Sequence, residues 1–155
     1  MEKYEESLSR AVKSLETADH MVYVTFPLIK EQKLLLRILV EIYDCLLGLI
    51  NAMLQYEYYY KRIEVFKEPK DNFQTFREIS PGYGITEYQI EKIIEILKLA
   101  ERHKKSPFEF VKNENIIIMS EGMKTDVLNL EKIKFYLLES KDILRKVNNV
   151  IKKRI

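Results

Sequence analysis

Hydrophobic residues in the first part of the chain recur at the period of an α-helix. In residues 2–25 they fall on one helical face, at Tyr4, Leu8, Leu15 and Val22. Small residues form a second stripe, along which another helix could approach closely: Ser7, Ala11, Ser14 and Ala18. Pro27 is expected to end or kink this helix, because proline lacks a backbone N–H and clashes with the preceding turn.

The segment from Leu34 to Leu54 is apolar around most of its helical circumference and long enough to raise the question of a membrane span. Its polar residues and those just beyond it form one narrow seam, at steps of three and four: Arg37, Glu41, Asp44, Gly48, Asn51, Gln55, Tyr58 and Arg62. Three charges in the first half of a lipid-embedded helix would cost several kcal/mol. We therefore predict the central helix of a bundle and no association with a membrane.

A short helix and a third long helix follow. The short helix is expected at 71–79, before a tight loop at Ser80–Gly84. Thr86 and Gln89 then match a capping box, in which each side chain can bond the other residue's backbone N–H. The third long helix is therefore expected to begin here and to end near Lys105, shortly before a proline.

Between residues 108 and 127 the period changes from that of a helix to that of a strand. β-Branched and aromatic residues predict strands near Phe108–Lys112 and Asn115–Met119, and Met123–Val127 is a candidate third strand. Asn129 then caps a last helix. The sequence thus predicts one domain, residues 1–155, of the mainly α class. Its architecture would be an up-down bundle of four main helices with a small antiparallel β element before the last helix.

Composition and charge exclude several kinds of site. The net charge of +2 is close to neutral, so nothing in the overall charge demands a polyanionic partner. Cys45 is the only cysteine and the two histidines are not four residues apart, so we predict no metal site and no disulfide. No glycine-rich phosphate loop is present, and we predict no cofactor. The charged N-terminus lacks an apolar signal core, which favours a cytoplasmic location.

The stretch QYEYYYKR, residues 55–62, combines four tyrosines with two cations. Exposed rings beside cations can stack nucleobases, which is worth roughly 1–3 kcal/mol per base. In that interpretation the stretch supplies four binding residues: Tyr58, Tyr59, Lys61 and Arg62. The alternative, which the apolar helix favours, is that the rings close the end of the core and keep their hydroxyls in water.

Two cationic helix ends are further candidates for contact with a partner. Arg102 and His103 lie at the end of the third long helix. The C-terminal fifteen residues contain one acid, Asp142, and six cations: Lys141, Arg145, Lys146, Lys152, Lys153 and Arg154. Cations near a helix C-terminus also interact favourably with the helix dipole, so solvated helix ends would explain both clusters without a partner.

The polar seam of the long helix is the candidate for catalytic chemistry. If the first two long helices form a hairpin that turns near residues 28–31, then Asp19 and His20 approach Arg37. A buried group of these residues would be an acid–base site of the hydrolase or nuclease kind: His20 with Arg37, Glu41 and Asp44. A solvated seam, tied by ion pairs four residues apart, is the simpler interpretation.

At ADHMVYVTFPLIKEQKLLL and again at ERHKKSPFEF, the chain resembles a family of small, uncharacterised archaeal helical proteins. In these, an acidic residue and a histidine lead into a Tyr-Val-Thr-aromatic-Pro run and a long apolar helix. A His-Lys-Lys-Ser-Pro stretch then precedes a short β element. The resemblance extends from about Val12 to Val150 and implies an archaeal origin and this architecture, but no activity.

A weaker resemblance, in topology alone, is to the HEPN superfamily of helical RNA-associated domains. Both share a long helical hairpin followed by further helices. Active HEPN members carry an arginine followed four to six residues later by a histidine. In this chain Arg10 lies ten residues before His20, and Arg102 lies directly before His103. The chain therefore lacks the motif of the active members.

These observations predict a non-enzymatic binding or adaptor module. Its partner would be a protein, a second copy of the chain or an RNA. The tyrosine-rich helix end and the basic C-terminus support this prediction, and no catalytic signature competes with it. The alternative is a HEPN-like or other hydrolase that uses the polar seam.

Overall fold

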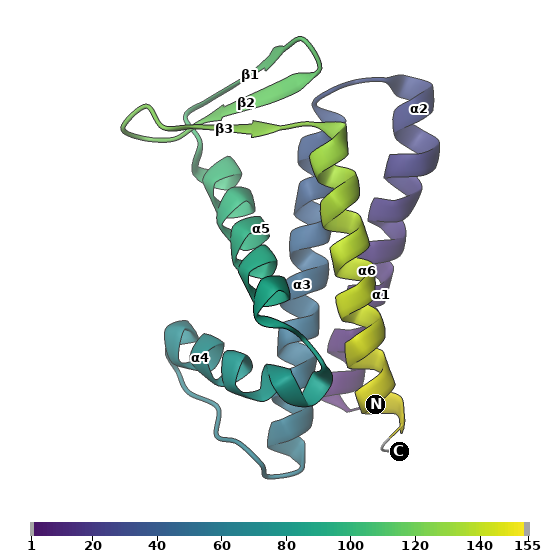
Figure 1. The fold of residues 1–155 in the computed structure, drawn as a ribbon, viewed down its shortest axis with the longest axis vertical. Coiled ribbons are helices and arrows are strands. Elements are labelled where there is room, and N and C mark those ends of the chain that lie inside the picture. Colours follow the sequence, from purple (N-terminus) through teal and green to yellow (C-terminus); the bar gives the residue numbers. More distant parts are fainter. Residues whose placement is uncertain (1, 154–155) are drawn as a thin grey trace.

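The computed structural model describes residues 2–153 and shows long helices side by side, with a small sheet at one end of the bundle (Figure 1). The long helices run alternately up and down the bundle: α1 (Lys3–His20), α3 (Leu34–Tyr59), α5 (Glu87–Lys105) and α6 (Leu130–Lys153). The strands precede α6 and form an antiparallel sheet in the order β1-β2-β3: Phe108–Lys112, Asn115–Met119 and Thr125–Leu128.

The mainly α class, the up-down order and the place of the β element are confirmed, but the count of four helices is not exact. The short helix expected at 71–79 is present as α4 (Pro69–Ile79), which begins two residues earlier and crosses the end of the bundle opposite the sheet (Figure 1). The candidate third strand is present as β3. The predicted helix starts are also present: Thr86 and Gln89 form their capping box, and Asn129 accepts a hydrogen bond from the backbone N–H of Lys132 at 2.9 Å.

Pro27 does not end the first helix. The helix widens into a π-helical stretch at Met21–Thr25 and continues as α2 (Phe26–Ile29). The backbone N–H of Phe26 bonds the carbonyl of Met21, five residues back, and this wider turn accommodates the proline that follows. The chain leaves the helix only at Lys30, whose φ of 54° is left-handed.

The predicted hairpin of α1 and α3 is present, and its helices touch at small residues. Ser7 Oγ donates a hydrogen bond to Gln55 Oε1 at 2.8 Å. A Cβ atom on Gly48 would lie 3.1 Å from the Cβ of Ala11 and 3.2 Å from the carbonyl oxygen of Ser7. The small stripe of α1 therefore sets the distance between the two helices.

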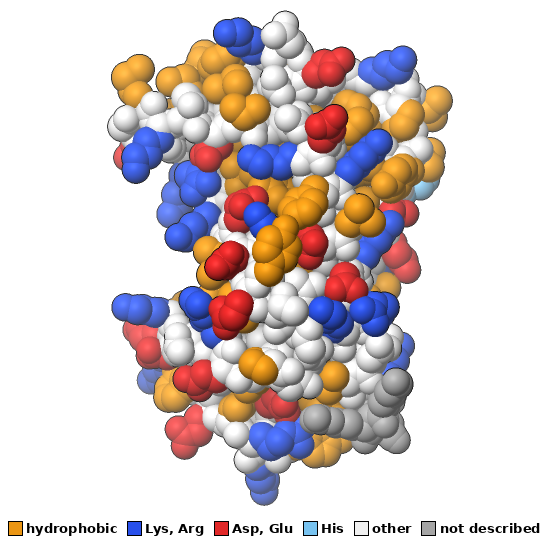
Figure 2. Space-filling model, viewed as in Figure 1, with side chains coloured by type: hydrophobic (Ala, Val, Ile, Leu, Met, Phe, Trp, Pro, Cys, Tyr) orange, Lys and Arg blue, Asp and Glu red, His pale blue; other side chains and the backbone are white. Residues whose placement is uncertain are grey.

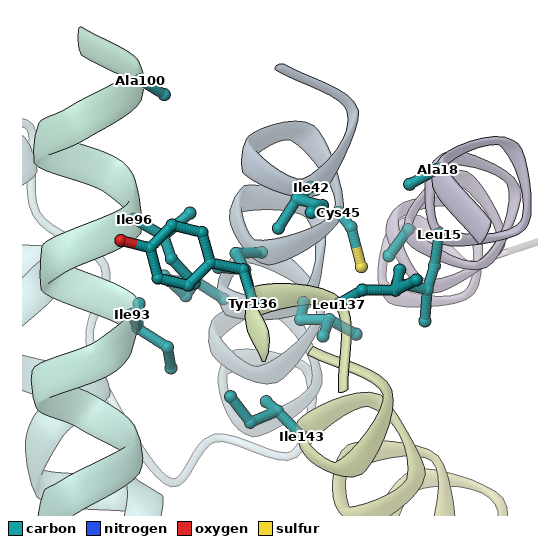
Figure 3. Close-up of a cluster of buried hydrophobic side chains, with 14 of the residues drawn as sticks. Leu15, Ala18, Ile42, Cys45, Ile93, Ile96, Ala100, Tyr136, Leu137 and Ile143 are labelled. Atoms are coloured by element: carbon teal, nitrogen blue, oxygen red, sulfur yellow. The ribbon is translucent and has the colours of Figure 1, made fainter. Parts of the chain in front are cut away.

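The core surrounds α3, whose buried side chains include Leu35, Ile38, Leu39, Ile42, Cys45, Leu46, Leu49 and Met53. Side chains from α1, α5 and α6 meet them in one cluster (Figure 3). Burial raises the pKa of the Cys45 thiol to about 12, so this cysteine behaves as a small apolar side chain. The central position predicted for this helix is confirmed. Within residues 2–153, no helix is long and apolar enough to cross a membrane.

One polar contact crosses this core. Tyr136 of α6 is fully buried, and its hydroxyl points to α5 (Figure 3) and donates to Glu95 Oε2 at 2.6 Å. Burial raises the pKa of Tyr136, and the Glu95 carboxylate raises it further. Burial alone would raise the pKa of Glu95, but hydrogen bonds from Tyr136 and Lys92 outweigh it and lower that pKa.

Replacing Gly48 with Leu should destabilise the protein by about 1–3 kcal/mol, because the side chain would force α1 and α3 apart. The better helix propensity of Leu, worth up to about 1 kcal/mol, would offset only part of this loss. Urea unfolding followed by circular dichroism measures the change. The matched control is Gly82→Leu, where an added Cβ would have no atom within 4 Å. Equal stability of the two variants would contradict the close approach.

Replacing Tyr136 with Phe should lower the free energy of unfolding by about 1–3 kcal/mol at pH 7, because the Glu95 carboxylate loses a buried donor. A carboxyl whose pKa is lowered by folding stabilises the protein above its unfolded pKa, and this contribution is lost as the pH falls through the folded pKa. The deficit of the variant should therefore shrink on acidification below the ordinary pKa of Glu95. Urea unfolding of both proteins at pH 7 and at about pH 3 tests this. The exposed Tyr88→Phe is the control, with little change expected at either pH.

Candidate functional site

The four residues of the predicted acid–base site do not form one cluster. Arg37 and Glu41 pair along α3 at 3.7 Å, which is the predicted contact four residues apart. Asp44 is exposed. His20 is exposed as well and lines a shallow hollow with other residues of the first helix. In the described part of the chain, no hydrogen bond or ion pair links His20 to Arg37, Glu41 or Asp44. Asp19, expected near Arg37, instead forms an ion pair with Lys141 of α6.

The tyrosines at the end of α3 pack mainly against one another. Tyr4, Tyr56, Tyr60 and Tyr59 form a closed cycle of edge-to-face contacts, with ring centroids 5.0 to 5.7 Å apart. Tyr4 and Tyr56 are buried. Burial raises the pKa of Tyr4 to about 12, with a smaller contribution from Tyr60. These contacts favour the interpretation that the rings close the core.

Arg62, predicted to bind a partner, is exposed but contacts neighbouring residues at the end of α3. Its guanidinium donates to Glu57 Oε2 at 2.5 Å and lies over the rings of Tyr56 and Tyr60, 5.4 and 5.0 Å from their centroids. Burial alone would lower the pKa of Arg62, but Glu57 raises it. These contacts attach the cation to the end of α3.

Tyr58, Tyr59 and Lys61 remain exposed and line a groove of about 640 Å³ between the ends of α1 and α3. Its other charged residues are Glu2, Lys3 and Glu64, so cations and acids balance. A groove with no excess of positive charge lacks the main contribution to nucleic-acid affinity.

Arg102 and His103 attach the sheet to α5. Arg102 donates to both carboxylate oxygens of Asp126 on β3, at 2.7 and 3.1 Å. His103 Nδ1 lies 2.6 Å from Glu109 Oε2 on β1. Lys104 lies over the ring of Tyr43 on α3, 4.0 Å from its centroid. The cations predicted at this helix end thus have a structural role.

The basic residues near the C-terminus are also largely paired within the protein. Lys141 pairs with Asp19, Arg145 pairs with Asp142 at 2.7 Å, and Lys146 donates to Gln89 at 2.8 Å. The hydrogen bond from Arg145 is the main reason that the pKa of Asp142 is lowered. Lys152 is exposed, and Arg154 lies outside the described residues.

The inner face of the sheet packs against the helices along β2 and β3. Along each strand, alternate side chains point to the same face. The inner face carries Ile116, Ile118 and Leu128, each at most 1% exposed. Both acids of the strands, Glu109 and Asp126, also point inward, where His103 and Arg102 of α5 contact their carboxylates.

The outer face of the sheet is apolar and uncovered, and sequence reasoning did not identify it as a site. The pairings Phe108 with Met119, Phe110 with Ile117 and Ile117 with Val127 place five apolar side chains on this face. Phe108 is 58% exposed and Val127 is 40% exposed, while the other three are half-buried. Figure 2 shows hydrophobic side chains gathered over the sheet. We call these five residues the outer face: Phe108, Phe110, Ile117, Met119 and Val127.

The sequence did contain a signal for this surface. The strand NIIIM is apolar at consecutive positions, so that it presents apolar side chains to both faces of the sheet. A strand with one face in water normally alternates apolar with polar residues. The missing alternation is typical of a strand in a sheet that is covered on both faces.

No group of three or more His, Cys, Asp or Glu side chains within residues 2–153 is arranged to hold a metal ion. In comparisons with known proteins, no protein-family model matches the chain, and no similar chain was found among the curated proteins or the solved structures.

Proposed function

We propose that the protein is a non-enzymatic binding module and that it binds a protein partner through the outer face of its sheet. The observation that carries the proposal is the uncovered apolar surface of Phe108, Phe110, Ile117, Met119 and Val127. Contiguous exposed apolar surface on a folded domain commonly marks an interaction site. The surface is rigid, because the inner face of the same sheet is packed on the bundle.

The charges around the outer face favour a protein over an RNA. The two acids of the strands point inward, and the only cation within the strands is Lys112. Affinity for RNA comes largely from cations that face phosphates. The cations that the sequence predicted for this role, Arg62 and Arg102, are bonded to acids within the protein. An apolar centre with few charges instead matches the core of a protein interface.

A photoreactive phenylalanine analogue placed at Phe108 should form covalent adducts with a protein when irradiated in cells of the natural host. The same analogue at Tyr88 on α5, which is 51% exposed, is the matched control. Mass spectrometry identifies the adducts, and a second copy of this chain counts as a protein. Protein adducts at position 108 and not at position 88 are expected. Equal yields at the two positions, or nucleic-acid adducts at 108, would refute the proposal.

Labelled single-stranded RNA should show no specific binding to the protein. In an RNA complex, affinity should fall steeply as salt rises from about 50 to 200 mM, because bound cations are released from the phosphates. Fluorescence anisotropy at both salt concentrations measures this. Salt-dependent binding that is lost in a Tyr58→Ala, Lys61→Ala variant would assign RNA recognition to the groove at the end of α3.

A further inference from the structure

The backbone hydrogen bonds of the sheet show which groups of β1 point away from it. The N–H of Ser120 donates to the carbonyl of Lys124 at 2.9 Å, just beyond the pairs of Ile118 with Asp126 and Ile116 with Leu128. Bonded pairs in an antiparallel ladder recur at every second residue. The even-numbered residues of β2 therefore bond β3, and its odd-numbered residues bond β1.

It follows that Phe108, Phe110 and Lys112 bond β2, since they pair with Met119, Ile117 and Asn115. The two-residue turn after Lys112 agrees, because the residues that flank such a turn form a bonded pair. The N–H and C=O groups of Glu109 and Val111 must then point to the free edge of the sheet. Within residues 2–153, no hydrogen bond reaches these four groups.

The two edges of the sheet differ in this respect. On β3, the outward carbonyl of Val127 accepts a hydrogen bond from Lys132 Nζ at 3.0 Å. On β1, no described side chain bonds the outward groups, and Val111 is 41% exposed beside a hollow of about 220 Å³ that separates the strand from the start of α3. The charge of Glu109 does not protect this edge against pairing with another strand, because its carboxylate contacts His103 Nδ1 at 2.6 Å. Open strand edges are templates for pairing with another strand.

We propose that β1 pairs with β1 of a second copy of the chain, antiparallel about a two-fold axis at Phe110. This register places Glu109 opposite Val111 of the second copy, and Val111 opposite its Glu109. The free backbone groups of each strand then bond those of the other. The result is one six-stranded sheet across the dimer, formed by addition of a strand at an edge.

The side chains of β1 suit pairing with itself. At the axis, Phe110 meets its own copy in a pair that is not hydrogen-bonded, where side chains approach most closely and aromatic pairs are favourable. Lys112 lies beside Phe108 of the second copy, so a cation meets a ring and the two lysines stay at opposite ends of the interface. Glu109 and Lys112 are the only charges of the strand and cancel, so no net repulsion opposes the contact.

This inference is separate from the proposed function, because the free backbone edge carries it and the outer face remains open in the dimer. Light scattering and sedimentation equilibrium, from micromolar to sub-millimolar protein, should show a reversible dimer. Val111→Pro should weaken it at least tenfold, because it removes an outward N–H and leaves the bonds to β2 intact. Val111→Thr is the matched control and should dimerise like the natural chain.

Amide hydrogen exchange on the natural chain provides a test that needs no variant. Exchange at Glu109 and Val111 should slow as protein concentration rises, while exchange at Ile117 stays constant. A monomer at every concentration would overturn the dimer and leave the outer-face proposal standing. A dimer that persists in a folded Val111→Pro but is lost in Phe110→Ser would also overturn edge pairing. It would then place the second copy on the outer face.

Discussion

The burial of α3 on most of its circumference is the constraint on which the rest of the structure depends. A helix this apolar must be covered by neighbours, and α1, α5 and α6 supply the cover. The part of its polar seam at Arg37 and Asp44 lies where the neighbours leave access to water. The same seam contains Gly48, whose missing side chain lets α1 pack directly against the helix backbone. The apolar faces of α3 thus determine where the other helices pack, and its seam supplies both an exposed polar stretch and the close contact with α1.

Much of the fold could be predicted because its signals are local. Caps at Thr86 and Asn129, the period of three and four in α3 and the change to strands at Phe108 each depend on a few neighbouring residues. The π-helical stretch before Pro27 could not be predicted. Whether a helix ends at a proline or widens to pass it depends on the packing beyond it. The partner of Asp19 was missed for a similar reason, since Lys141 comes from a helix more than a hundred residues away.

The acidic partners of the charged residues in the candidate site could not be predicted from the sequence. Arg62, Arg102 and His103 looked available because their acidic partners are not at the usual helical spacing of three or four residues. Glu57 is five residues from Arg62, and Asp126 is on another element from Arg102, so only the folded chain brings them together. The outer face was predictable in principle, because the apolar run of β2 lacks the polar positions that a wet face requires.

The positions of the two strand acids leave the outer face of the sheet and the edge of β1 without an acidic side chain. The register of the strands places Glu109 and Asp126 opposite the buried Ile118, on the inner face, and His103 and Arg102 contact their carboxylates there. Charges at those positions are a common way of protecting sheets against association. Here they fix the sheet to the bundle instead, and the apolar face and the open edge of β1 stay unprotected. Because side chains alternate between the faces of a strand, these acids could reach the outer face only by a shift of register that would also expose Ile118.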